Sequence, residues 1–232
     1  MNGSIYLIPV TLGGENFNET IPAGVLETAR RLRFFVVEEI RSARRFLRMI
    51  DKSFPIDETD FRILNEHTGE TDISNYLDPC LKGNDIGLMS EAGMPGIADP
   101  GARLVKIAHR RGIKVIPLAG PSSIFMTLAA SGMNGQNFAF NGYIPVKGPE
   151  RESKLKELEK KAHGGVSQIF IETPYRAMKT LESIIASCNG ETQLCIGADI
   201  SLPGEFIITR KISEWKKSLP DLKDKLVVFI LQ

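Results

Sequence analysis

Short apolar runs alternate with segments of helical spacing along the first half of the chain. The runs predict buried strands at 4–10, 34–37, 61–64, 85–90 and 114–118. The segments between them predict helices at 22–31, 41–50, 73–81 and 102–111. This alternation indicates parallel βαβ units whose helices cover a sheet.

The second half of the chain has a different pattern. Helices are expected at 121–132, 150–162 and 175–187. Strands are expected at 138–143, 168–172, 193–200, 205–212 and 226–231, with little helix between the last three. The turn residues Leu202-Pro203-Gly204 predict a hairpin. We therefore expect an α/β fold of two α/β lobes with a cleft between them. A mainly parallel N-terminal sheet would lie in 1–118 and a mixed C-terminal sheet in 119–232, with a hinge near 117–121.

Composition narrows the class of protein. The 232 residues are 42% hydrophobic and 25% charged, which is typical of a globular chain and excludes a disordered one. A net charge of +1 excludes a strong overall attraction to polyanions. Three scattered cysteines, without metal-ligand spacing, predict reduced, mostly buried thiols and no metal site. No signal peptide or apolar membrane segment is present, so a soluble intracellular protein is expected.

A glycine-rich segment follows one expected strand and precedes a helix. It reads Ser-Glu-Ala-Gly-Met-Pro-Gly-Ile-Ala-Asp-Pro-Gly, residues 90–101. Ligands of open α/β sheets bind beyond the carboxyl ends of the strands, and glycines let a flat ligand approach the main chain. The segment lacks a Gly-x-Gly-x-x-Gly pattern and a following Walker lysine, so phosphate is not the expected ligand. From spacing alone, an ordinary loop and a ligand-binding loop are equally open.

Two other strand ends carry polar residues before a helix. Residues 117–124 read Pro-Leu-Ala-Gly-Pro-Ser-Ser-Ile, where Ser122 and Ser123 either cap the helix or bond to a ligand. Residues 169–176 read Ile-Phe-Ile-Glu-Thr-Pro-Tyr-Arg. From this segment alone, Glu172 is interpreted as a residue next to a helix cap.

Taken together, these segments resemble the tetrapyrrole methylase superfamily of S-adenosylmethionine-dependent methyltransferases. The order and spacing of 90–101, 117–123 and 169–176 carry the resemblance, with Phe-Asn-Gly-Tyr-Ile-Pro at 140–145. Within the superfamily, the chain is most similar to bacterial enzymes that methylate a cytidine ribose 2′-hydroxyl of small-subunit ribosomal RNA. Glu38-Glu39-Ile40-Arg41 with Arg44-Arg45 resembles their Ala-Glu-Asp-Thr-Arg…Arg-Arg, and Asn65-Glu66-His67 resembles their His-Glu-His.

The resemblance implies a homodimer that binds S-adenosyl-L-methionine in the cleft between the lobes and acts on ribosomal RNA or the small ribosomal subunit. Carried over residue by residue, it implies a set of cofactor-binding positions: Leu12, Gly93, Met94, Ile97, Ser122, Ser123, Ile124, Ile171 and Glu172.

The chain departs from the ribosomal RNA pattern in four places. Residues 9–14 read Pro-Val-Thr-Leu-Gly-Gly where the family has Thr-Pro-Ile-Gly-Asn. Met94 and Gly96 replace Thr and Leu, and Pro174-Tyr175 replaces Thr-His. The family's C-terminal extension is not expected after 226–231.

Methylation of a ribose hydroxyl benefits from a base or a charge that stabilises the developing alkoxide. The candidates for catalysis are Glu38, Arg41, Glu66 and His67. Arg41 is expected to hold the Glu38 carboxylate in an ion pair, although a solvated salt bridge is an equal alternative. His67 beside Glu66 also fits an ordinary surface pair.

Seven arginines lie close together, at 30, 31, 33, 41, 44, 45 and 48. They either contact phosphates or form a solvated helix face. Three functions remain open at this point. An RNA ribose methyltransferase leads, followed by a methylase of a corrin or porphyrin precursor and a non-catalytic binding module of the same fold.

Overall fold

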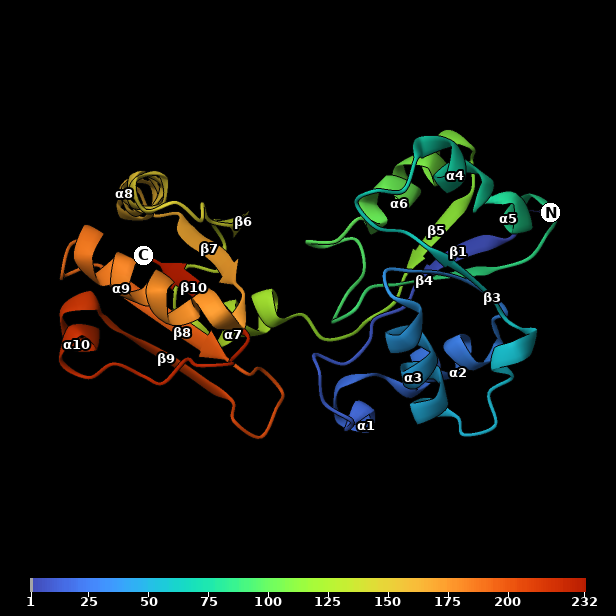
Figure 1. Cartoon of the computed structure of the whole chain (residues 1–232), viewed down its shortest axis with the longest axis horizontal. Coiled ribbons are helices and arrows are strands. Elements are labelled where there is room, and N and C mark those ends of the chain that lie inside the picture. The colour runs from blue at the N-terminus through green and yellow to red at the C-terminus, as the bar shows by residue number, and fades with distance from the viewer. Residues whose placement is uncertain (1) are drawn as a thin grey trace. The chain divides into compact units, whose positions relative to one another are not determined.

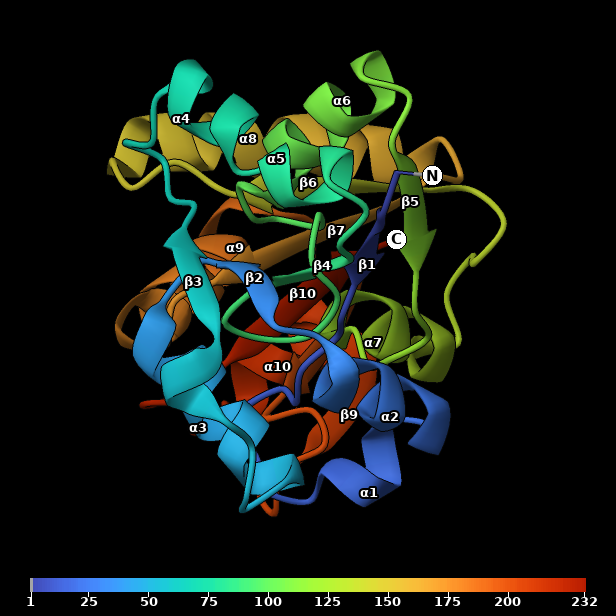
Figure 2. The same ribbon diagram turned by 90° about the vertical axis from the view of Figure 1, so that its right-hand side faces the viewer.

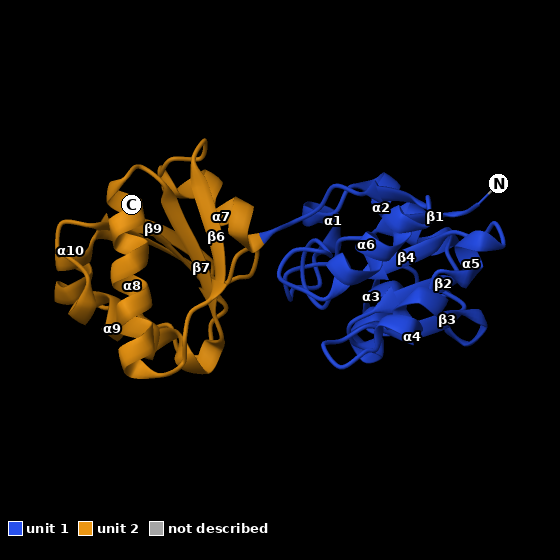
Figure 3. Ribbon diagram, turned by 90° about the horizontal axis from the view of Figure 1, so that it is seen from above, with its two compact units in different colours: residues 1–122 blue, residues 123–232 orange. Residues whose placement is uncertain are grey.

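The computed structural model describes residues 2–232, and the chain divides into two compact units, Met1–Ser122 and Ser123–Gln232 (Figures 1 and 3). Each unit contains one five-stranded sheet. Each also has its own buried hydrophobic clusters, two in the first unit and one in the second. The expected α/β fold with two sheets is confirmed, and each unit is described by itself.

The sheet of the first unit is entirely parallel, as its short apolar runs predict. Its strands are β1 (Ser4–Leu7), β2 (Phe34–Val37), β3 (Asp60–Ile63), β4 (Ile86–Met89) and β5 (Lys114–Pro117). They lie in the order β3-β2-β4-β1-β5, and all four pairings are parallel. The central strand β4 is buried along its whole length, as expected for a sheet covered on both faces.

Helices cover both faces of this sheet (Figure 2). One face carries α2 (Ala23–Arg31) and α3 (Ile40–Ile50), and the other α4 (Glu70–Asn75), α5 (Asp78–Leu81) and α6 (Gly101–Arg110). A short helix α1 (Phe17–Thr20) and a 3₁₀ turn η1 (Ile56–Glu58) complete the unit. Right-handed crossovers explain this division, because the chain moves one way across the sheet through β1, β2 and β3 and then back through β4 and β5.

The single helix expected at 73–81 is wrong, because the structure has the two short helices α4 and α5 there. Pro79 lies in the first turn of α5. Proline has no N–H to donate, and its ring disfavours helical geometry at the residue before it. The helical spacing of the apolar residues continues through the break, since Ile73 and Leu77 are both fully buried.

The sheet of the second unit is mixed, as expected. Its strands are β6 (Phe138–Tyr143), β7 (Ser167–Glu172), β8 (Gln193–Ala198), β9 (Phe206–Lys211) and β10 (Val227–Leu231), in the order β6-β7-β10-β8-β9. The β6–β7 pairing is parallel and the other three are antiparallel. The predicted hairpin is confirmed, since β8 pairs with β9 through the intervening turn.

Three helices cover one face of this sheet and one covers the other (Figure 3). The three are α8 (Gly148–His163), α9 (Ala177–Ser187) and α10 (Ile212–Lys217), and the fourth is α7 (Ser123–Ser131). The expectation of little helix between the last strands missed α10, which buries only Ile212 and Trp215 and follows β9 without a gap. A 3₁₀ turn, η2 (Pro174–Arg176), replaces the first turn of the helix expected at 175–187.

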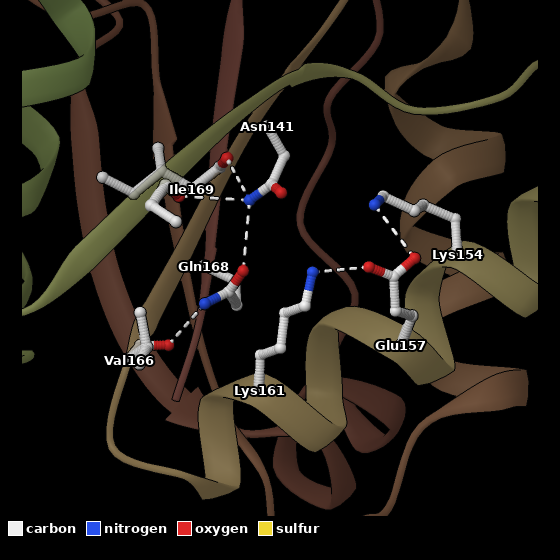
Figure 4. Close-up of polar contacts among 8 residues, drawn as sticks. Asn141, Lys154, Glu157, Lys161, Val166, Gln168 and Ile169 are labelled. Atoms are coloured by element: carbon white, nitrogen blue, oxygen red, sulfur yellow. Dashed lines mark hydrogen bonds and ion pairs between the residues drawn. The ribbon is translucent and has the colours of Figure 1, made fainter.

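The parallel edge of the second sheet has one irregularity. The β6–β7 register shifts between Phe140 and Tyr143. There the side-chain amide of Asn141 donates to the carbonyl oxygens of Ala139 at 3.1 Å and Ile169 at 3.3 Å, and also to Oε1 of Gln168 (Figure 4). The asparagine thus satisfies carbonyl groups at the point where the ladder is interrupted.

Candidate functional site

The five strands of the first unit are parallel, so their carboxyl ends lie at one edge of the sheet. Most of the expected site residues of this unit are in the loops at that edge: Leu12 after β1, Glu38 after β2, Glu66 and His67 after β3, Gly93, Met94 and Ile97 after β4, and Ser122 after β5. The topology therefore brings to one edge of the sheet candidate site residues that are spread over more than a hundred positions of the sequence. This edge is the usual ligand site of an open α/β sheet.

The loops after β1 and β4 are joined by main-chain hydrogen bonds. The N–H of Val10 donates to the carbonyl of Gly93 at 3.0 Å, and the N–H of Gly93 donates to that of Thr11 at 3.4 Å. Gly93 has φ +71°, and a Cβ there would lie 3.0 Å from Cδ2 of Leu12 and 3.1 Å from the carbonyl oxygen of Pro121. Glycine is favoured at this point, where three strand-end loops converge, because another residue would be strained at this φ and its Cβ would crowd both neighbours.

Asp99 holds the glycine-rich loop in shape. Its Oδ2 accepts from the N–H of Gly96 at 2.8 Å, and its Oδ1 accepts from the N–H of Gly101 at 2.6 Å. Burial raises the pKa of Asp99, and these hydrogen bonds oppose that rise. No role was predicted for Asp99 from the sequence. Its position directly before Pro-Gly at the start of a helix is a signal for a carboxylate that accepts from free helix N–H groups.

Glu38 and Asp99 line one pocket. The pocket is formed by Glu38, Asn65, Glu66, Ala98, Asp99, Pro100 and Arg103. Burial raises the pKa of Glu38, and the nearby Glu91 and Asp99 carboxylates raise it further against a lowering hydrogen bond from the N–H of Glu91. Two carboxyl groups with raised pKa values in one pocket are typical of a functional site.

Arg103 connects α6 to the loop after β3. It donates to the carbonyl oxygens of Asn65 at 3.2 Å and Thr68 at 2.6 Å. The loop is thereby fixed, but the side chains of Glu66 and His67 are each 85% exposed and lie 3.4 Å apart. Glu66 lines the pocket and His67 does not. The structure thus brings Glu66, but not His67, to the pocket wall beside Glu38.

The expected ion pair between Glu38 and Arg41 is wrong, because no such pair occurs within residues 2–232. Glu39 is the N-cap of α3, where its carboxylate accepts from the N–H of Ser42 at 2.6 Å. Glu38 therefore precedes the helix and bonds to Glu91, whereas Arg41 lies in the first turn and is exposed.

In the second unit, Ser123 and Ile124 begin α7, and Ile171 and Glu172 end β7. The carboxylate of Glu172 is buried and accepts from the N–H of Thr173 at 2.8 Å and the hydroxyl of Thr180 at 3.0 Å. It also pairs with Nη2 of Arg176 at 2.5 Å. These contacts fix the turn between β7 and α9, so the Glu172 carboxylate has a structural role within the protein.

The donor set at the strand ends fits S-adenosylmethionine, which combines an adenine with a zwitterionic tail. Leu12, Met94 and Ile97 are the apolar side chains of these loops, and the main chain turns at Gly93 and Gly96, which both have positive φ. A Cβ at Gly96 would meet nothing within 4 Å, so the main chain there is approachable. Apolar walls with a few placed polar groups suit such a ligand.

In the part of the chain that the structure describes, no group of three or more histidine, cysteine, aspartate or glutamate residues is placed to hold a metal ion. No helix within residues 2–232 is long and apolar enough to cross a membrane.

Known proteins resemble the chain over most of its length. Residues 5–216 match the family model described as Tetrapyrrole (Corrin/Porphyrin) Methylases. A protein named Ribosomal RNA small subunit methyltransferase I from Vibrio cholerae is 30% identical over 210 residues, which cover 90% of this chain and 69% of that protein. Its namesake from Streptococcus pyogenes is 30% identical over 213 residues, which cover 92% and 70%.

Solved structures agree on the fold. The methyltransferase CobJ superposes with a TM-score of 0.65 at 16% identity, covering 99% of this chain and 93% of that one. The uroporphyrin-III-C-methyltransferase from Thermus thermophilus gives 0.57 at 14% identity, covering 100% and 92%. At these identities the likeness concerns the fold alone.

Proposed function

Because the chain belongs to the tetrapyrrole (corrin/porphyrin) methylases and is an S-adenosylmethionine-dependent methyltransferase, we propose that it methylates a ribose 2′-hydroxyl of small-subunit ribosomal RNA. The observation that carries the substrate is the 30% identity to relatives named for small-subunit ribosomal RNA methylation. A homodimer in the cytoplasm is part of the proposal, and light scattering of the purified protein tests the dimer.

The chain has two tasks in this reaction. S-adenosylmethionine supplies a methyl group that is activated by its positive sulfur. The protein must align the ribose oxygen with that group, and such positioning contributes about 7–11 kcal/mol. It must also accept the hydroxyl proton, which contributes about 10²–10⁴-fold in rate.

We assign to Glu38 the role of accepting the proton of the ribose hydroxyl. Its carboxylate lies at the end of β2, is half-buried, and is oriented by the N–H of Glu91 at 3.3 Å. The raised pKa makes this carboxylate a stronger base than an exposed glutamate. Glu66 lies at the wall of the same pocket, where it adds negative charge. Arg41 and His67 take no part in proton transfer in this proposal.

The proposed cofactor contacts are made mostly by main-chain and apolar groups. In the first unit they comprise Leu12, Gly93, Met94, Ile97 and Ser122. For Ser123, Ile124 and Ile171 of the second unit, a role in cofactor binding stays an expectation of the family resemblance. Asp99 holds the loop that carries Met94 and Ile97. Glu172 supports its neighbour Ile171 by fixing the turn after β7.

A Glu38→Gln variant tests both parts of the proposal. Small ribosomal subunits from a strain that lacks the gene serve as substrate, and mass spectrometry of their RNA reports ribose methylation. We expect the rate to fall by about 10²–10⁴-fold with S-adenosylmethionine binding unchanged in calorimetry. Glu39→Gln is the matched control, since a glutamine there still accepts from Ser42.

Two results would contradict the proposal in different ways. Identical ribose methylation in the deletion strain and its parent rejects the substrate. Full activity of Glu38→Gln rejects only the base. Transfer of a labelled methyl group to a corrin or porphyrin precursor, but not to ribosomal subunits, supports the other chemistry that the family's description names.

A further inference from the structure

Helix α3 presents four arginines to solvent. Arg41, Arg44, Arg45 and Arg48 are all exposed, and we call them the arginine ridge. They are spaced by three and four residues, so they are neighbours on the helix surface. Helix α3 contains no acidic residue to balance them.

The ridge differs from the other charged helix. On α8, Glu157 pairs with Lys154 at 3.0 Å and with Lys161 at 2.5 Å, so these two cations share an acidic partner within the helix (Figure 4). Within residues 2–232, no member of the ridge forms an ion pair.

Two ridge arginines have partners of other kinds. Arg44 lies 5.3 Å over the Phe61 ring, and Arg48 donates to the carbonyl of Lys52 at 2.5 Å. For the side chains of Arg41 and Arg45 the described residues offer no hydrogen-bond partner. Four positive charges thus share about 10 Å of helix, and the acidic residues beside them are the two capping residues, Glu39 near Arg41 and Asp51 near Arg48.

The other three arginines of the cluster have structural partners instead. Arg30 donates to the carbonyl of Ile50 at 2.7 Å, Arg31 pairs with Asp85 at 2.9 Å, and Arg33 donates to the carbonyls of Arg30 and Leu32. The sequence left open whether the seven arginines contact phosphates or form a solvated helix face, and the structure divides them into two groups. Three arginines hold the first unit together, and four are available to a ligand.

The ridge lies beside the proposed reaction site of the first unit. Helix α3 begins two residues after Glu38. Arg45 lines a pocket with Thr11, Gly13 and Gly14 of the loop after β1 and with Ser90 and Glu91 of the loop after β4. Glu15 and Glu91 make the inside of that pocket unfavourable for phosphate. An anion is therefore expected on the outer side of the helix.

We propose that the arginine ridge binds the phosphate groups of the RNA strand that carries the methylated ribose. This inference rests on the proposed function and adds the surface that holds the substrate. Guanidinium groups bind phosphate through paired hydrogen bonds, and an arginine pair four residues apart spans about 6 Å of the helix axis. Phosphate contacts set position without reading sequence. They suit an enzyme whose net charge of +1 gives no overall attraction to RNA.

The test compares two double variants. Arg41→Ala with Arg45→Ala removes the two ridge arginines that have no hydrogen-bond or ion-pair partner within residues 2–232. Lys154→Ala with Lys161→Ala removes two paired charges from α8. Binding of a short, labelled, single-stranded RNA of mixed sequence is measured by fluorescence anisotropy at several salt concentrations. The slope of log affinity against log salt is expected to fall in magnitude by about 1.4 in the ridge variant, at about 0.7 per phosphate contact. It should not change in the α8 variant. Arg41→Lys with Arg45→Lys should recover most of the slope.

The outcome can be separated from that of the proposed function. On small ribosomal subunits, the ridge variant is expected to raise KM with kcat and S-adenosylmethionine binding retained. If the wild-type enzyme methylates the subunits but the ridge variant has an unchanged salt slope, only the proposed role of the ridge is rejected. A fall in slope without subunit methylation by the wild type leaves the ridge standing and rejects the proposed function. Displacement of the RNA by polyglutamate as readily as by unlabelled RNA overturns the assignment to nucleic acid.

Discussion

The carboxylate of Glu38 accepts a hydrogen bond of 3.3 Å from the main-chain N–H of Glu91. This contact joins the end of β2 to the loop after β4, the neighbouring strand in the sheet. The same loop is clamped by Asp99 and bonded to the loop after β1. The proposed base and the proposed cofactor loop therefore form one connected unit at the strand ends.

The pH dependence of methyl transfer tests this arrangement. Burial raises the pKa of Glu38, so the carboxyl stays protonated to a higher pH than an exposed glutamate, and activity should rise as pH increases through that raised value. The Asp99 charge contributes to the rise. Asp99→Asn should therefore shift the acid limb of the kcat/KM profile to lower pH.

The position of that limb separates an electrostatic effect from a structural one. If Asp99→Asn acted only by loosening the glycine-rich loop, it would lower the maximum kcat/KM and leave the midpoint of the acid limb unchanged. Asp57→Asn, at an exposed acid in η1, is the control and should leave the midpoint unchanged. A midpoint that does not move in Asp99→Asn contradicts the coupling between the two carboxyl groups.

A substitution at Gly120 tests the close approach of the loops after β1 and β5. A Cβ at this position would lie 2.2 Å from Cγ of Pro9 and 2.3 Å from its Cβ. Gly120→Ala should lower the free energy of unfolding by about 1–3 kcal/mol, because the rigid proline ring must move. Gly24→Ala in α2 meets nothing within 4 Å and should raise it by about 0.5–1 kcal/mol. Urea unfolding measures both, and equal stabilities would refute the predicted contact.

The buried ion pair of the second unit gives a further prediction. Arg176→Leu leaves the Glu172 carboxylate, which is 2% exposed, without its cation. Removing one partner of a buried pair costs about 3–5 kcal/mol. Lys147→Ala removes the cation of an exposed pair with Glu150 and should cost about 1 kcal/mol or less. If urea unfolding of the second unit shows similar losses for the two variants, the pair is not the support of the turn described above.

The cysteines should be unreactive in the folded protein. Burial raises the pKa of Cys80 to about 11 and that of Cys188 to about 12, and it also raises the pKa of Cys195. Alkylation requires the thiolate, so a raised pKa slows it at neutral pH. Mass spectrometry after iodoacetamide treatment should find little labelling of the native protein and complete labelling in denaturant. Rapid native labelling would disprove the burial of these thiols.

Most strands and long helices were predictable from the sequence because apolar spacing determines them locally. The run at 34–37 and the segment at 138–143 have the predicted bounds in the structure. The break between α4 and α5 was missed because the apolar spacing continues across it while Pro79 changes the backbone. Helix α10 was missed because its few residues directly continue a strand.

The site was predictable only in part. The glycine-rich loop and Glu38 follow strand ends, and the parallel order of the strands brings them together. The Arg103 contact with Asn65 joins residues 38 positions apart, and no local pattern predicts it. The pair expected between Glu38 and Arg41 relied on their closeness in sequence, but Glu38 precedes the cap of α3 and accepts from the N–H of Glu91 instead.

The parallel sheet of the first unit separates packing from chemistry. The side chains on its faces lie in two buried clusters, whereas the residues proposed to bind the cofactor and the acceptor lie in loops at its carboxyl edge. Substitutions in the loops after β2 and β3 can therefore change the proposed acceptor site while the strands beneath them stay the same.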